Sequence, residues 1–175
     1  MNKSKNRQFN LLVIIGAMLF CAACGSKTET PSTVTFEASA TGPFFSGPNS
    51  LIAEYSVDLS ALDGLKDVSK DQIDEIKISS VRVILNDEND MDFSSFSSAT
   101  IQMVSSDVDM QTIAIKNPIE TKTQELVFDL SDEVDIADYF KGEKLSLVLD
   151  LDFIEDSFIE EIGAQVIMDI TVKNN

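Results

Sequence analysis

The 175-residue sequence predicts an all-β domain, a two-sheet antiparallel β-sandwich with one or two short helical turns. Three observations favour this fold. About eight segments alternate apolar with polar residues, which is the two-residue period of a half-buried strand. Polar, glycine or proline turns separate several of them, and no segment has a long helical period. Hydrophobic residues make up 43% of the chain and charged residues 25%, a composition typical of one ordinary folded domain.

The alternation locates each strand. Its clearest example runs from residue 145 to 153, where Leu145, Leu147 and Leu149 begin a regular series. Residues 76–85 are β-branched on both faces and therefore predict a more central strand. The predicted strands are residues 33–38, 51–59, 76–85, 99–104, 112–116, 125–130, 145–153 and 165–173.

Two short helical turns interrupt the strand pattern. Ser69 and Gln72 have the spacing of a capping box, which predicts a short helix or a single turn over residues 69–75. Residues 132–140 predict one or two further turns, in which Tyr139-Phe140 supply apolar contacts.

The predicted elements form one domain, residues 33–175, without an internal repeat. Short antiparallel strands occur both in jelly rolls and in immunoglobulin-like Greek keys, and the alternation does not distinguish the two. A domain of about 150 residues buries roughly 68–70% of its unfolded surface, so it can fold without a disulfide.

The first 23 residues are typical of a signal peptide. Lys3, Lys5 and Arg7 precede an apolar run over residues 9–23. A membrane-spanning helix needs roughly 20 apolar residues, so this 15-residue run is short for a permanent span. We therefore expect residues 1–23 to be an export signal that is removed.

The run ends in Cys21-Ala22-Ala23-Cys24, and small residues directly before a cysteine resemble the lipobox of bacterial lipoproteins. This resemblance implies cleavage after residue 23, attachment of diacylglycerol to the Cys24 thiol and acylation of the freed amine, commonly with palmitate. Cys21 departs from the family, which most often has Leu at that position. The alternative is a Cys-x-x-Cys redox pair, but such a pair belongs at a strand-to-helix junction of a folded domain.

A lipidated Cys24 implies a membrane anchor without a membrane-spanning fold, because each buried methylene of an acyl chain contributes about 0.8 kcal/mol. Residues 24–32 would then be the lipidated residue and a polar tether. The expected location is the bacterial cell envelope, at the outer membrane. Residues 26–29 are only weakly acidic and do not decide between the periplasmic and the surface face.

A second resemblance concerns the C-terminal half. Residues 134–141, then Leu145-Ser146-Leu147-Val148-Leu149, then a polar turn and an alternating last strand look like uncharacterised β-sandwich lipoproteins of Bacteroidota. The resemblance covers residues 76–172 and rests on the general pattern. It implies the fold and the envelope location, and it carries no activity.

The composition excludes several functions. The chain has no histidine, which removes Ser/His and Cys/His nucleophile pairs and zinc sites that need imidazole. A formal net charge of −17 repels nucleic acid, whose binding requires clustered Lys and Arg, and it also repels anionic lipid headgroups. We therefore expect no nucleic-acid partner and no enzymatic activity.

An acidic loop after residue 85 is a candidate metal site. Asp87, Asn89, Asp90 and Asp92 supply oxygen ligands at short spacing, which suits calcium. The Gly and the distant bidentate Glu of an EF-hand are absent, and an acidic turn needs no metal. Calcium is the one cofactor that the sequence suggests.

Phe44-Phe45 are candidates for an exposed recognition loop, because they lie between Gly42-Pro43 and Gly47-Pro48. The alternative is that one ring closes the end of the sandwich while the other covers it.

Three functions remain open. The first is a non-enzymatic lipid-anchored binding module for a protein or a glycan, and it is the one we expect. The second is a periplasmic structural or assembly accessory. The third is a hydrolase that uses carboxylates such as Asp150 and Asp152, which share one strand face, although such pairs are commonly solvated.

Overall fold

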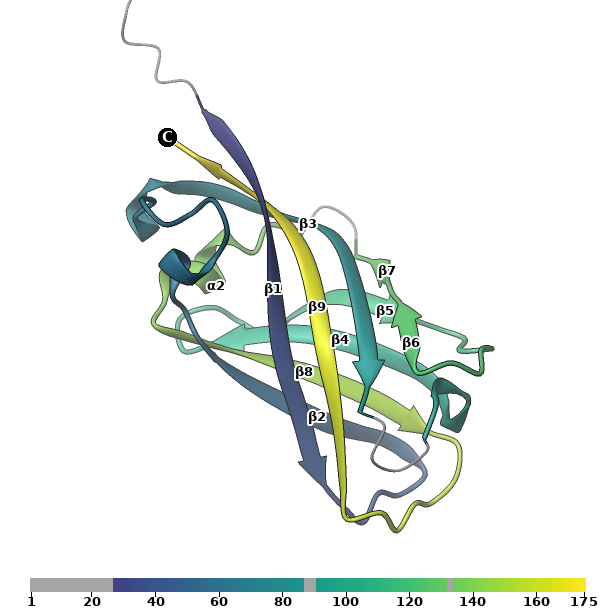
Figure 1. The fold of residues 1–175 in the computed structure, drawn as a ribbon. Coiled ribbons are helices and arrows are strands. Elements are labelled where there is room, and N and C mark those ends of the chain that lie inside the picture. The colour runs from purple at the N-terminus through teal and green to yellow at the C-terminus, as the bar shows by residue number, and fades with distance from the viewer. Residues whose placement is uncertain (1–26, 87–90, 132–133) are drawn as a thin grey trace, which may run out of the picture.

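The structure is a computed structural model that describes residues 27–86, 91–131 and 134–175. Strands dominate these residues, and four short helical segments accompany them (Figure 1). The strands are β1 (Thr28–Thr41), β2 (Gly47–Ser56), β3 (Ile73–Leu85), β4 (Phe96–Ser105), β5 (Gln111–Lys116), β6 (Glu125–Val127), β7 (Asp129–Leu130), β8 (Lys144–Phe153) and β9 (Glu161–Asn174). The helical segments are the 3-10 turns η1 (Leu59–Ala61), η2 (Lys70–Gln72) and η4 (Phe93–Ser95) and the helix α2 (Ala137–Lys141).

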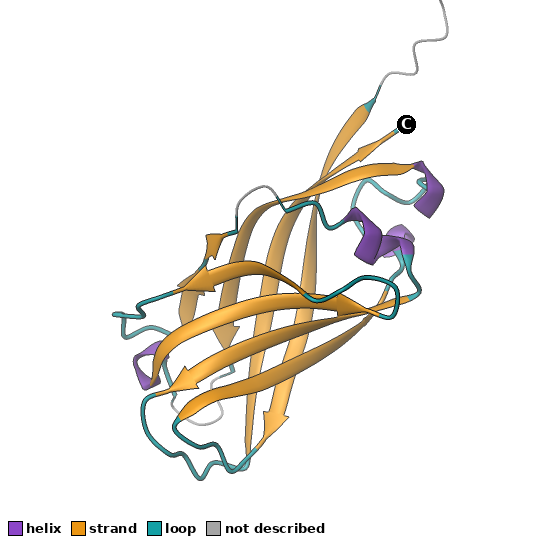
Figure 2. Ribbon diagram, turned by 180° about the vertical axis from the view of Figure 1, so that it is seen from behind, coloured by secondary structure: helices purple, strands orange, loops and turns teal. Residues whose placement is uncertain are grey.

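The strands form one antiparallel sheet in the order β6-β3-β9-β1-β2-β8-β4-β5-β7. This sheet folds over between β1 and β2, whose pairing is limited to Ser39 opposite Ile52. As a result, β6, β3, β9 and β1 form one layer, and β2, β8, β4, β5 and β7 form a second layer against it (Figures 1 and 2). The predicted all-β sandwich is confirmed, although hydrogen bonds join its two layers into one nearly closed sheet.

The strand pairs are nested along the chain. β1 pairs with β9, β2 with β8, β3 with β6 and β4 with β5. Strands paired in this way form one long hairpin that is rolled up on itself. The two layers that face each other then have the strand orders β1-β9-β3-β6 and β2-β8-β4-β5, which are those of a jelly roll. The structure therefore favours a jelly roll over an immunoglobulin-like Greek key.

A short segment joins the two layers on the side opposite the β1–β2 fold. Residues 125–130, predicted as one strand, are two strands: β6 pairs with β3, and β7 pairs with β5 in the other layer. Phe128 lies between them, is 4% exposed, and donates its backbone N–H to the Val81 carbonyl over 2.9 Å. The buried ring marks the point where the chain passes from one layer to the other.

The core lies between the layers. In β8, the inward leucines Leu145, Leu147, Leu149 and Leu151 are at most 1% exposed, as the alternation predicts. Each such side chain contributes roughly 1.5–3 kcal/mol when it is fully buried. Among the described residues, Ser32 is the one buried polar side chain of the core.

The helical predictions are confirmed in position and are shorter in extent. η2 forms a single turn in which Gln72 Oε1 accepts the Ser69 backbone N–H over 2.9 Å, before β3 begins. Asp135 Oδ1 accepts the backbone N–H of Ala137 at the start of α2 and that of Ile76 in β3, over 2.9 and 3.0 Å. No helix in the described part of the chain is long and apolar enough to cross a membrane.

Several predicted strand boundaries are wrong, and two of them change how a segment is assigned. β1 begins at Thr28, so residues 28–32 are not part of a polar tether. They pair with β9 from Asn174 to Ile170, and backbone hydrogen bonds need no apolar side chains. The predicted strand 51–59 is displaced towards the N-terminus, because Asp58 Oδ1 accepts the Ser60 backbone N–H over 2.9 Å and caps η1.

Replacing Phe128 with Ala should lower the free energy of unfolding by about 3–5 kcal/mol, because it leaves a cavity where the two layers are joined. The neighbouring Val127, which is 61% exposed, is the control, and its replacement with Ala should change stability by less than about 0.5 kcal/mol. Denaturant unfolding followed by circular dichroism measures both, since the chain has no tryptophan. Equal losses in the two variants would contradict the assigned role of Phe128.

Candidate functional site: the distal tip

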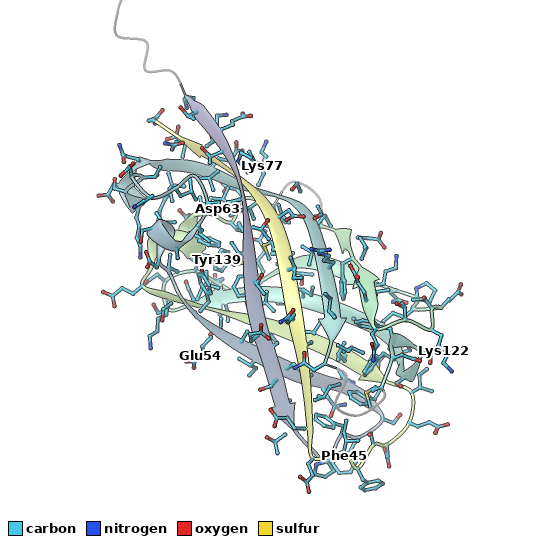
Figure 3. The ribbon with its side chains drawn as sticks, viewed as in Figure 1. Phe45, Glu54, Asp63, Lys77, Lys122 and Tyr139 are labelled. Carbon is cyan, nitrogen blue, oxygen red and sulfur yellow. The ribbon has the colours of Figure 1, made fainter. Side chains whose placement is uncertain are left out.

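Two loops meet at the end of the molecule that is farthest from Thr28. β1 carries the chain away from Thr28 over 14 residues, a length of about 45 Å in extended conformation. The β1–β2 loop, residues 42–46, and the β8–β9 loop, residues 154–160, both lie at that far end (Figure 1). We call these two loops the distal tip. Phe45 lies there, remote from the start of β1 (Figure 3).

Backbone hydrogen bonds hold the two loops together. Phe44 and Ser157 exchange both of their backbone hydrogen bonds, each over 2.8 Å, and so form an isolated antiparallel bridge. Gly42 N–H donates to the Glu160 carbonyl over 2.8 Å. Asp156 Oδ1 accepts the Ser46 backbone N–H over 2.9 Å. These bonds fix one loop against the other before any ligand is present.

Phe44 is buried, whereas Phe45 is exposed. Phe44 is 3% exposed, and its ring stacks on Phe153 with centroids 5.3 Å apart. Phe153 in turn meets Phe96 edge-on at 4.7 Å. The prediction of an exposed aromatic pair is therefore wrong for Phe44, because its ring closes this end of the core. Phe45 points outward and is 58% exposed.

Sequence reasoning missed two further exposed apolar residues of the distal tip. Phe158 is 80% exposed and Ile154 is 54% exposed, and both belong to the β8–β9 loop. Residues next to an antiparallel bridge point to the side opposite the bridged pair, so Phe45 and Phe158 share the outward side. Apolar residues on both sides of Glu155-Asp156-Ser157 were the available signal, and only the pairing of the loops joins them to Phe45.

A shallow depression of about 370 Å³ adjoins the distal tip. It lies between η4 with the residues before it and the start of the β8–β9 loop. Its lining consists of Met91, Ser94, Ser95, Phe153, Ile154, Glu155, Asp156 and Ser157. The depression thus continues the surface formed by the exposed side chains of the tip.

The distal tip is acidic. Glu155, Asp156 and Glu160 are exposed in the β8–β9 loop, and neither loop contains a Lys or an Arg. Exposed apolar side chains and carboxylates therefore lie together in the tip, and all charged side chains of its two loops are acidic.

The expected calcium site is only partly within the described residues. Asp87, Asn89 and Asp90 lie outside them. Asp92 accepts hydrogen bonds from the side chain and the backbone N–H of Ser94, which hold the pKa of its carboxyl below the usual value and cap η4. No group of three or more potential metal-binding side chains occurs in the described part of the chain.

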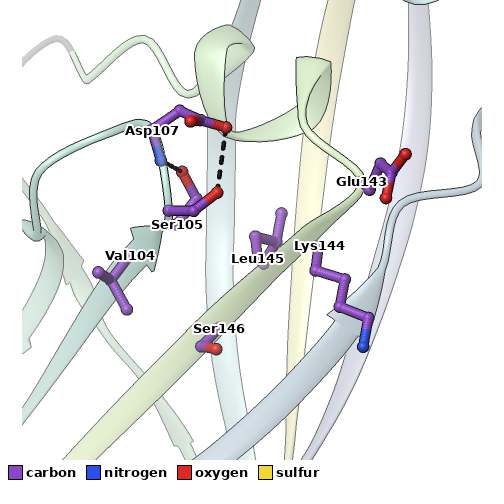
Figure 4. Close-up of a pocket in the computed structure, with 8 residues that line it drawn as sticks. Val104, Ser105, Asp107, Glu143, Lys144, Leu145 and Ser146 are labelled. Atoms are coloured by element: carbon purple, nitrogen blue, oxygen red, sulfur yellow. Dashed lines mark hydrogen bonds between the residues drawn. The ribbon is translucent and has the colours of Figure 1, made fainter.

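A second hollow, of about 550 Å³, lies between the turn after β4 and the start of β8 (Figure 4). Asp107 is held within its own turn, where it accepts from Ser106 Oγ over 3.0 Å and donates its backbone N–H to Ser105 Oγ over 3.3 Å. Glu143 lies on the other side of the hollow, and the Lys144 amine points away from Asp107. These side chains therefore do not converge on one point.

The carboxylates of Asp150 and Asp152 line neither hollow. Asp150 accepts a hydrogen bond from Ser50 Oγ, and Asp152 accepts one from Ser97 Oγ over 2.8 Å. Both side chains are thus engaged with serines of the neighbouring strands.

No protein-family model and no curated protein matches the chain. Among solved structures, a chain of Cocksfoot mottle virus is similar at 10% identity, with a TM-score of 0.34, over 86% of this chain and 96% of that one. A chain of Desmodium yellow mottle tymovirus is similar at 6% identity, with a TM-score of 0.25, over 83% and 89% of the respective chains. Likenesses at this level carry no argument about function.

Replacing Asp156 with Ala should free the Ser46 amide and accelerate its hydrogen exchange about fivefold, which corresponds to the roughly 1 kcal/mol of a typical hydrogen bond. Replacing the adjacent Glu155 with Ala is the matched control, because it also removes an exposed carboxylate from the same loop. Amide exchange followed by NMR distinguishes the two. Equal Ser46 exchange rates in both variants would show that Asp156 does not hold the loops together.

Proposed function

We propose that this chain is a non-enzymatic lipoprotein of the bacterial cell envelope, anchored in the outer membrane through Cys24, and that its distal tip binds a protein partner. The observation that carries the proposal is the position of the tip. Exposed Phe45 and Phe158 lie at the end of β1 opposite Thr28, and Thr28 is four residues after the cysteine that would be lipidated.

The geometry suits an anchored binding module. A lipid on Cys24 would hold the beginning of β1 close to the bilayer, because only residues 25–27 intervene. The tip would then be presented about 45 Å away, at the far end of the strand. A polar, acidic domain surface next to the membrane does not insert into it, so attachment would depend on the lipid.

The tip has the anatomy of a protein-binding surface. Exposed aromatic residues near an accessible depression are typical of the anchors that supply most of the energy of an interface. Large exposed apolar groups on a domain of this size commonly mark contact sites. The loops that carry them are already tied together by hydrogen bonds, so little conformational entropy would be lost on binding.

Replacing Cys24 with Ser should abolish incorporation of labelled palmitate and move the protein from the membrane fraction to the soluble fraction, because the acceptor thiol is lost. Replacing Cys21 with Ser is the control and should leave both properties unchanged. Membrane retention and labelling of the Cys24 variant would contradict the proposed anchor.

A photo-crosslinking amino acid placed at Phe45 should give a discrete adduct of higher mass in intact cells. The same group placed at Ile52, which is 52% exposed on β2, should not give that adduct. Mass spectrometry of the digested adduct, showing peptides of a second protein joined to the labelled position, would identify a protein partner.

An adduct whose added mass is removed by glycosidases would replace the protein partner with a glycan. Absence of any adduct at Phe45, or the same adduct at Ile52, would contradict binding through the tip.

A further inference from the structure

We infer that the distal tip recognises a cationic polypeptide segment, in which Lys or Arg side chains flank an apolar side chain. This inference rests on the proposed function and names the chemistry of the partner. Its basis is the combination of exposed apolar side chains, an adjoining depression and a rim of carboxylates within two loops that contain no basic residue.

The apolar part of the surface comes from both loops. Phe45 is contributed by the β1–β2 loop, and Phe158 and Ile154 by the β8–β9 loop. Ile154 also lines the depression, so the exposed side chains and the hollow form one continuous surface. At about 370 Å³ the depression lies at the small end of the range for ligand pockets, which suits a side chain of a longer segment.

The carboxylates of the distal tip favour a bound segment of positive charge. Glu155 and Asp156 line the depression, and Glu160 follows Phe158 by two residues. Desolvating these acids against an apolar or an anionic surface would be unfavourable, because nothing there would replace their interaction with water. Lys or Arg side chains of a partner would supply that replacement and would also steer association.

The same charges disfavour other occupants. A second copy would bring acids against acids, and the net charge of −17 adds a long-range repulsion. Membranes with anionic headgroups and nucleic acids would be repelled for the same reason. A neutral glycan could contact the aromatic rings and donate hydroxyl hydrogen bonds to the carboxylates, but it would leave their negative charge uncompensated.

The test uses the mature full-length protein anchored in immobilised phosphatidylcholine bilayers, with bare bilayers as the blank. The probes are four molecules: a peptide of alternating Lys and Leu, a peptide of alternating Glu and Leu, a peptide of alternating Lys and Ser, and chitohexaose. We expect binding of the Lys-Leu peptide at least tenfold tighter than that of any other probe, and weaker as NaCl rises from 50 to 500 mM.

Matched variants distinguish the effect of the acids in the distal tip from the effect of the net charge of the protein. E155Q/E160Q removes two acids from the rim and should weaken binding of the Lys-Leu peptide at least fivefold. D63N/D67N removes two exposed acids from the loop after η1, where neither makes a hydrogen bond or ion pair among the described residues, and should change binding by less than twofold. F45A/F158A should weaken binding at least tenfold.

Equal weakening by both charge variants would overturn the inference, because it would show attraction to the whole protein. Tighter binding of the Glu-Leu peptide or of chitohexaose would also overturn it. The proposed function fails separately, through the absence of a crosslink at Phe45. A crosslink at Phe45 whose yield is unaffected by E155Q/E160Q would retain the proposed function and reject the cationic partner.

Discussion

The pairing of the first strand with the last is the constraint on which the rest of the structure depends. β1 and β9 are in register over 14 residue pairs, from Thr28 opposite Asn174 to Thr41 opposite Glu161. Once they are paired, β2 and β8 continue the same long hairpin, and the remaining strands can only roll up inside it. The weak link between β1 and β2, at Ser39 and Ile52, is where this hairpin bends from one layer into the other.

This nesting also creates the distal tip. β1 ends where β9 begins, and β2 begins where β8 ends, so the β1–β2 and β8–β9 loops must meet although they are far apart along the chain. The bridge between Phe44 and Ser157 fixes their meeting point. Phe44 turns inward against Phe153, and the same alternation turns Phe45 outward. One aromatic residue thus completes the core while its neighbour is left exposed at the surface.

Acidity has two consequences in this molecule. On β8 and β9, carboxylates accept hydrogen bonds from neighbouring hydroxyl groups. Asp169 on β9, for example, accepts from Ser80 and Thr33, which holds its pKa below the usual value. At the distal tip, Glu155, Asp156 and Glu160 lie in the same loop as the exposed Ile154 and Phe158. The second arrangement is the basis for inferring a cationic partner.

The sequence by itself determined the all-β class, the inward leucines of β8 and the position of the turn at Lys70–Gln72, because alternation and capping are local properties of the chain. Only the tertiary structure decided the jelly-roll order, the division of residues 125–130 between two layers and the inclusion of Thr28–Ser32 in β1. Phe45 could be proposed from its Gly-Pro flanks, whereas Phe158 and Ile154 could not. Their contribution depends on a loop-to-loop contact more than 100 residues apart, and such contacts follow from backbone pairing across the whole chain, which a local pattern does not encode.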